Sequence, residues 1–421
     1  DSPRSERMSS RVIDTGIEWS LMVVAASILV ADINHLLEYT FIALAIVVLA
    51  RQIASRDRRL ARTSLDVPIF VFLGWILISI VTATDPTYSF AEWRKLLAHV
   101  LIFFLVANFI SEESQAKRIL GAFVVGVLFM SIYGIVEFLV AGGSLVDQWY
   151  ERTLRADSLT SEYNWFSTYL MMALPIVAVW ALATDHREWR IVLVVTLIVA
   201  TFALFLTYTR AAWIAVVVQA CLLVTLKGSK VMKLVVAGMV MVALSMVIVV
   251  TMQDVPKGAS GERGVEGHTV NLSTLLCRLH ILERGTKDVI EHPVAGLGYG
   301  SKTFARKYHD IHVPQCPPQL HNIHSTYMSL AFGAGIPALY FFMWIFWRIL
   351  HTFWIGFVQE PSEFQRMLAL GLLMMTVGMM IRIAFDVMFL GMLAVLFWML
   401  VGLFFGLQIK RPSALPPPAG H

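Results

Sequence analysis

The chain has 421 residues, of which 57% are hydrophobic and 15% are charged, and its mean hydropathy is +0.70. An ordinary soluble domain carries about 25% charged residues, so this composition excludes an ordinary soluble domain. The formal net charge of +4 tells less than the positions of the charges along the chain, and no nucleic-acid partner is expected.

Apolar runs of about 17 to 25 residues, the length that crosses a bilayer core, recur along nearly the whole chain. We therefore predict an all-α polytopic membrane protein with about twelve transmembrane helices. They are expected near residues 17–31, 36–50, 67–83, 96–110, 119–141, 164–183, 191–207, 211–226, 232–251, 323–348, 365–384 and 387–408. Further spans follow the first run, and no small-residue cleavage site lies behind it, so no cleavable signal is expected.

These runs divide the chain into four parts. Residues 1–251 hold nine predicted helices, residues 252–322 form a large polar loop, residues 323–408 hold three helices, and residues 409–421 form a tail. With an inside N-terminus, the inner segments hold 19 Lys and Arg and the short outer loops hold six. Because basic residues favour the cytoplasmic side, both ends are predicted inside and the large loop outside.

Six cations are predicted on the outer side against this trend, and they are Arg94, Lys95, Arg152, Arg155, Arg210 and Arg382. Arg210 lies between two apolar helices with no acid within a helical turn. A cation at such depth needs a partner or a polar cavity, so we predict a functional role for Arg210. Arg382 lies one turn before Asp386, so a salt bridge is the alternative to a substrate contact.

Arg94 and Lys95 are predicted to open the helix at 96–110. An anion would interact favourably there with both cations and with the free amides of the first turn. Arg155 is a candidate for the same anion, with a solvated loop charge as the alternative. Guanidinium groups gathered at a membrane rim suit a diphosphate, because each planar fork matches two phosphate oxygens.

The large loop is predicted to contain amphipathic helices. In residues 271–290 the apolar side chains fall largely on one helical stripe, with Arg278 on the other side. A helix lying along the membrane or over a cavity is therefore expected. A tight turn is predicted at residues 296–300, followed by a second short helix at 301–309 that Ser301 would cap.

A histidine-rich run follows, and it contains His309, His312, Cys316, His321 and His324. Three interpretations are open, namely a zinc site, a structural role, and His324 as a catalytic base or acceptor-orienting group. The run contains prolines and no HExxH or CxxC accompanies it, so no metal is predicted. Imidazole gains and loses a proton near neutral pH, so His324 is the predicted base, and His321 is a candidate substrate contact.

The chain has three cysteines. Cys221 lies within an apolar helix and is expected to pack there. Cys277 and Cys316 both lie in the large loop, where an oxidising compartment would permit a disulfide. A bridge needs two closely spaced Cα atoms, so a disulfide and two free thiols both remain open.

Three stretches resemble the bacterial O-antigen ligase family, part of a superfamily with O-antigen polymerases and some protein O-oligosaccharyltransferases. Residues 206–212, LTYTRAA, resemble the family's segment of Thr or Ser, Arg and a small residue. Arg278 and then residues 292–300, HPVAGLGYG, are similar to its Arg…HPxxGxGxG stretch. His324-Ser325, nine residues and Gly335 resemble its H[NSQ]x9GxxG signature, with Ala338 in place of the last glycine.

The resemblance implies a GT-C-like glycosyltransferase of the bacterial inner membrane with its active site on the periplasmic face. The donor would be a glycan on undecaprenyl diphosphate, and the acceptor a sugar hydroxyl of the lipid A–core. Arg210 and Arg278 would hold the diphosphate, and His324 would activate or orient the acceptor. The reaction would invert the anomeric centre without a metal or another cofactor.

The residues agree with this chemistry. No Asp-x-Asp pair occurs in the outer segments, whereas well-placed cations can neutralise the charge that grows on a leaving diphosphate. An O-antigen polymerase, which extends a lipid-linked glycan, would share these arginines and is the main alternative. A transporter would be expected to show internal repeats and charged or broken helices at mid-membrane, and no duplicated halves are visible in the sequence.

Overall fold

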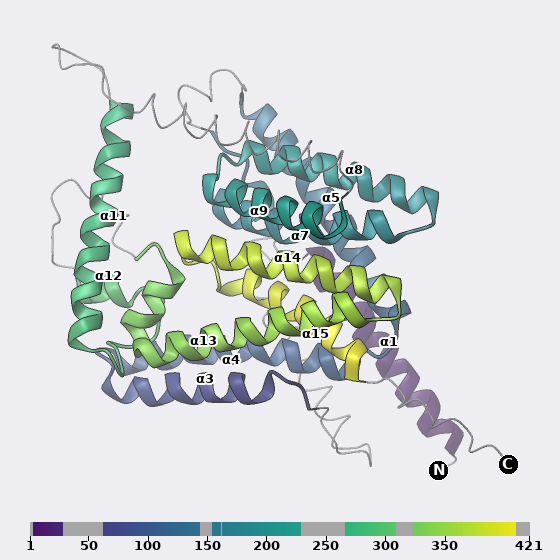
Figure 1. The fold of residues 1–421 in the computed structure, drawn as a ribbon, viewed down its shortest axis with the longest axis horizontal. Helices are drawn as coiled ribbons and strands as arrows, with labels where there is room; N and C mark the ends of the chain where they lie inside the picture. The colour runs from purple at the N-terminus through teal and green to yellow at the C-terminus, as the bar shows by residue number, and fades with distance from the viewer. Residues whose placement is uncertain are drawn as a thin grey trace.

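The computed structural model describes residues 3–27, 62–143, 154–160, 162–228, 266–308 and 323–409. Every regular element in these ranges is a helix, which confirms the all-α class (Figure 1). The α-helices are α1 (Pro3–Ser27), α3 (Asp66–Ser79), α4 (Pro86–Phe109), α5 (Glu113–Val140), α7 (Tyr163–Ala183), α8 (Arg187–Leu206), α9 (Arg210–Lys227), α11 (Glu266–Glu291), α12 (Thr303–Lys307), α13 (Thr326–Gln359), α14 (Glu363–Phe385) and α15 (Gly391–Ile409). Two short 3-10 turns, η2 (Ile80–Thr82) and η3 (Ser158–Thr160), complete the described elements.

Seven of the described helices are long and apolar enough to cross a membrane, and they are α5, α7, α8, α9, α13, α14 and α15. Each coincides with one of the predicted spans, so the chain is a multi-pass membrane protein. The predicted spans at 36–50 and 232–251 lie outside the described residues. The total of twelve spans and the side on which the large loop lies therefore stay predictions.

The break between α8 and α9 falls at the predicted place. α8 ends at Leu206 and α9 begins at Arg210. Between them, Tyr208 has a φ of 50°, a left-handed conformation that a residue with a Cβ rarely adopts. This conformation reverses the chain, so Arg210 opens the next helix.

The described helices form a bundle with two distinct ends. Asn164 at the start of α7 bonds Arg382 near the end of α14, so these two helices are antiparallel. Lys227 at the end of α9 lies 5.7 Å from the ring centre of Phe357, which is near the end of α13. The starts of α7, α9 and α13 and the end of α14 therefore share one end of the bundle. Figure 1 shows α11 at this end, running across the direction of α13 and α14, and we call it the α11 end.

A backbone joint connects α11 to α13. Gly335 has a φ of +82° and interrupts α13, and a Cβ at this position would overlap the carbonyl of Val294. The loop at 292–300 enters this break, where the amide of Gly298 donates to the carbonyl of Gly333 at 2.7 Å. Only glycine allows both the positive φ and the close approach, so this joint fixes α11 relative to the start of α13.

Two predictions for the loop need correction. The second short helix begins at Thr303 with Lys302 as its N-cap, not Ser301, because the Lys302 amide is held by the Tyr88 hydroxyl of α4 at 2.9 Å. The single apolar stripe predicted for α11 is in fact two faces. Ile281 is buried against the joint, whereas Leu282 is exposed.

Candidate functional site

His324 lies at the entrance to α13, at the α11 end of the bundle. The next residue, Ser325, caps α13 by accepting the Met328 amide at 3.4 Å, which fixes the chain on the C-terminal side of the imidazole. The Nδ1 atom of His324 lies 3.4 Å from a carboxylate oxygen of Asp386. The Nε2 atom is buried, and no described group hydrogen-bonds to it. His324 therefore has one nitrogen bound to a carboxylate and one nitrogen available for another group.

Asp386 follows α14 directly and holds its carboxylate between several donors. The Val387 amide donates to the same oxygen at 2.9 Å, and Arg382 lies 3.8 Å from the other oxygen. Burial alone would raise the pKa of Asp386, but the hydrogen bond from His324 and the charge of Arg382 hold that pKa below its usual range. An ionised Asp386 accepts a hydrogen bond from Nδ1–H of His324, which leaves the lone pair on Nε2.

Arg382 is buried, with 1% of its surface exposed. Its Nε donates to the Thr168 hydroxyl at 3.1 Å, and its guanidinium donates to the Asn164 amide oxygen at 3.0 Å. A buried cation in a membrane helix needs such partners. The salt bridge that the sequence offered as an alternative is present, and a substrate contact by Arg382 stays a prediction.

Glu162, just before α7, adds a second carboxyl group to this cluster. Burial raises the pKa of Glu162 above its usual value, and the negative charge of Asp386 adds to the rise. Sequence reasoning missed Glu162, Asn164 and Thr168. Their signal was a polar residue pair four positions apart, facing one way at the start of an otherwise apolar run.

The predicted arginines lie at the same end of the bundle as His324. Arg278 on α11 is exposed and close enough to Arg382 for their charges to interact. Arg210 is exposed at the start of α9. Arg155 lies 4.3 Å from the ring centre of Tyr163, beside Asn164. The structure thus places Arg382 beside Asp386, and Arg155, Arg210 and Arg278 at the same end of the bundle.

A comparison with protein families covers this part of the chain. Residues 193–343 match the family model described as O-antigen ligase. This match supports a relation to the O-antigen ligase/polymerase superfamily over that part of the chain. The match spans Arg210, Arg278 and His324, and it confirms the resemblance that the sequence motifs gave. No curated protein matches the chain.

The remaining predicted site residues lie elsewhere or outside the described ranges. The predicted helix start at residue 96 is wrong, because Asp85 caps α4 by accepting the Tyr88 amide at 3.0 Å and Pro86 is its first residue. Arg94 and Lys95 therefore lie within α4 rather than at its N-terminus. Their role as an anion site stays a prediction. His321 lies outside the described residues.

Most candidate zinc ligands and one cysteine of the candidate disulfide lie outside the described residues. In the part of the chain that the structure describes, no three His, Cys, Asp or Glu side chains gather as metal ligands. His309, His312, Cys316 and His321 fall outside that part, so the alternative is not tested. Cys277 is disulfide-bonded and Cys221 is free, as expected for a bridge within the loop, but the proposed partner Cys316 is not among the described residues.

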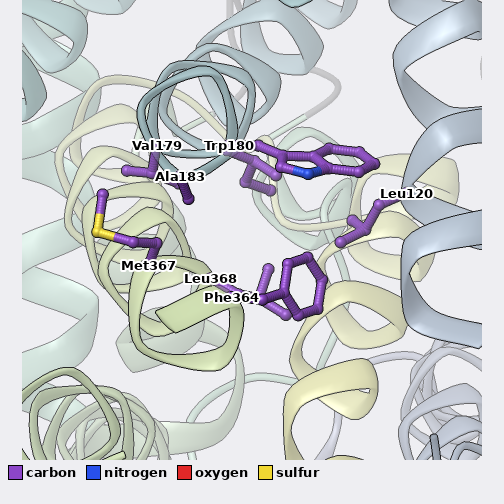
Figure 2. Close-up of a pocket in the computed structure, with 8 residues that line it drawn as sticks. Leu120, Val179, Trp180, Ala183, Phe364, Met367 and Leu368 are labelled. Carbon is purple, nitrogen blue, oxygen red and sulfur yellow. The ribbon is translucent and has the colours of Figure 1, made fainter. Parts of the chain in front are cut away.

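One pocket lies far from this cluster. It is a gap of about 10 Å³ between α5, α7 and α14, lined by apolar side chains that include Leu120, Trp180 and Phe364 (Figure 2). Phe364 is at the start of α14 and Arg382 near its end, so the gap is at the opposite end of the bundle. Its size suits about one water molecule, which excludes it as a substrate site.

Proposed function

We propose that this protein is an O-antigen ligase. It transfers a glycan from undecaprenyl diphosphate to a sugar hydroxyl of the lipid A–core at the periplasmic face of the inner membrane. The match at residues 193–343 supports the ligase or polymerase class, and the arrangement of His324, Asp386 and the arginines supports glycosyl transfer from a diphosphate. The transfer is metal-independent and inverts the anomeric centre.

The reaction is a single displacement. Nε2 of His324 takes the proton of the acceptor hydroxyl while the hydroxyl oxygen attacks the anomeric carbon of the donor sugar. The bond from that carbon to the phosphate oxygen breaks, and the lipid diphosphate leaves with the electron pair. Arg210 and Arg278 neutralise the charge that develops on the leaving diphosphate. Each such contact lowers the activation free energy by about 3 kcal/mol. Attack from the face opposite the leaving group inverts the centre.

The observation that carries the proposal is the contact between His324 and Asp386. The carboxylate accepts a hydrogen bond from Nδ1–H, and Nε2 is buried without a described hydrogen-bond partner. This is the arrangement that a general base requires. A carboxylate nucleophile is not needed, because the diphosphate is already a good leaving group.

A polymerase would use the same chemistry on a different acceptor, a second lipid-linked glycan. The compact segment from His324 to Gly335 favours the ligase, because it is the stretch that resembles the ligase signature. The acceptor decides between the two functions.

The test is the lipopolysaccharide of cells that depend on this protein for glycan attachment. His324→Ala is expected to reach the membrane at the normal level and to abolish attachment of long glycan to the lipid A–core. His351→Ala, on the opposite half of the same helix α13, is the matched control and is expected to leave the pattern unchanged. A normal pattern of long-chain lipopolysaccharide in the His324→Ala strain would remove this residue from the mechanism.

Arg210→Lys tests the diphosphate contact. The ammonium of lysine keeps the charge but lacks the planar fork, so transfer is expected to fall at least about tenfold. The measurement is the initial rate of glycan attachment in membranes with equal amounts of the two proteins. Wild-type rates with lysine would argue against paired oxygen contacts at this position.

A further inference from the structure

α11 has two apolar faces, and only one of them is packed. Cys277 and Ile281 are 1% and 5% exposed and contact the core around the joint. Leu279 and Leu282 are 53% and 47% exposed. Exposed apolar surface of this size is a feature of interaction sites, because water contact with large apolar side chains is unfavourable.

The exposed apolar side chains form a row that begins at Arg278. Arg278, Leu282, Thr286 and Ile290 follow one another at intervals of four residues, so they lie along one side of α11. Leu279 is next to Leu282 in the neighbouring turn. Ile290 is 72% exposed, and at 1.5 Å per residue the row extends about 18 Å from Arg278. The row therefore joins one cation to a long apolar strip.

The cationic head of the row lies at the candidate site. The charge of Arg278 interacts with the charge of Arg382. Arg382 in turn pairs with Asp386, and Asp386 contacts His324. The charged side chains Glu283 and Lys287, which pair at 2.8 Å, flank this row along one edge, because Glu283 is four residues after Leu279 and Lys287 is three residues before Ile290. The apolar row therefore runs from Arg278 along α11 toward the C-terminal end of this helix at Glu291.

We propose that Leu279, Leu282, Thr286 and Ile290 form the docking surface for the lipid chain of the donor. The inference rests on the proposed function. In a lipid diphosphate the first isoprene unit is bonded directly to a phosphate oxygen. A diphosphate held by Arg278 therefore has its chain starting beside the same turn of α11. A cation followed by an apolar strip complements an anion followed by an apolar chain.

The experiment compares two donors with the same glycan diphosphate, one on the undecaprenyl chain and one on a single isoprene unit. The full-length purified protein is assayed as wild type and as Leu282→Gln/Ile290→Gln. The short donor ends within about one turn of Arg278 and cannot reach Ile290, about 18 Å along α11, so it loses at most the edge of the contact with Leu282. KM for the undecaprenyl donor is expected to rise about tenfold in the double variant, while KM and kcat for the short donor stay within about twofold of wild type.

Lys287→Gln, an exposed charged residue at the edge of the row, is the matched control and is expected to change neither KM by more than about twofold. Unchanged kcat with the short donor also shows that the double variant is folded. Leu282→Ala/Ile290→Ala is used in its place if the glutamine variant does not fold.

Three results would overturn the inference. An unchanged KM for the undecaprenyl donor would mean that the lipid chain lies elsewhere. Equal losses with both donors would mean that the row packs against the bilayer or a second copy of the chain. Absence of transfer by the wild-type protein with either donor would contradict the proposed function itself, and the inference would fall with it.

Discussion

The carboxylate of Asp386 lies between His324 and Arg382, at 3.4 Å and 3.8 Å. Its pKa lies below the usual range, because the hydrogen bond from His324 and the charge of Arg382 outweigh the effect of burial, which would raise that pKa. At neutral pH it is therefore an anion that selects the tautomer of His324 with the lone pair on Nε2. In the proposed mechanism the buried Arg382 and the ionised Asp386 orient His324 without entering the reaction.

Asp386→Asn is expected to lower kcat by about 10² to 10⁴ and to leave the donor KM almost unchanged. The asparagine amide can donate to Nδ1, which would move the proton of His324 to Nε2 and remove the base. Purified variants assayed at saturating donor provide the measurement. Asp185→Asn, an exposed residue before α8, is the control. A wild-type kcat in Asp386→Asn would show that the carboxylate does not set the tautomer.

The stability contributed by Asp386 is expected to depend on pH in one direction. A carboxyl whose folded pKa is lowered stabilises the protein fully above its unfolded value, about 3.9, and loses that contribution as pH falls through the lower folded value. Wild type should therefore melt at a higher temperature than Asp386→Asn at pH 6, and the difference should shrink by pH 3. A gap that is constant or wider at pH 3 would contradict the lowered pKa.

Removal of divalent metal is expected to leave transfer intact. The arginines neutralise the leaving diphosphate in the proposed mechanism, a task that a bound divalent ion performs in many enzymes. Initial rates are measured before and after dialysis against a chelator. A loss that zinc restores would favour the alternative site in the histidine-rich run.

At the scale of elements, the joint between the 292–300 loop and α13 holds the two sides of the site together. Gly335→Ala places a Cβ against the Val294 carbonyl and a side chain at a φ of +82°. We expect this change to lower the free energy of unfolding by at least about 2 kcal/mol and to reduce transfer, because α11 and α13 separate. Thermal unfolding in detergent, together with the transfer rate, measures both effects.

Gly74→Ala is the control for this substitution. Gly74 lies in α3, and a Cβ there meets nothing within 4 Å. Alanine in a helix is favoured over glycine by up to about 1 kcal/mol, so this variant should be as stable as wild type or slightly more so. Equal unfolding temperatures of Gly335→Ala and Gly74→Ala would mean that the joint does not constrain the fold.

Local signals in the sequence predicted many helix boundaries but not the contacts between helices. Tyr208-Thr209-Arg210 marked the break before α9 correctly, because a polar triplet interrupts two apolar runs. The start of α4 was predicted at residue 96, directly after the charged Arg94 and Lys95. The helix begins ten residues earlier, where Asp85 caps it and Pro86 is its first residue. The pairing of His324 with Asp386 joins residues 62 positions apart and follows from helix packing, which one sequence does not reveal.

At the scale of the whole molecule, the fold gathers the chemistry at one end of a helical bundle. α15 fills the interior of the bundle, and all its residues from 392 to 407 are buried. Tight contacts such as Phe103 with Phe405, whose ring centres are 5.3 Å apart, hold it against α4. The polar side chains of the candidate site, among them Asn164, His324 and Arg382, lie at the α11 end of this bundle.

The most direct test of the proposed function is transfer with purified protein, a lipid-diphosphate glycan, and each of two acceptors in separate reactions. The prediction is that lipid A–core is elongated by the wild-type protein and not by His324→Ala, while a second lipid-linked glycan is not extended. Elongation of the lipid-linked glycan alone would identify a polymerase, and equal activity of His324→Ala would contradict the base that the mechanism requires.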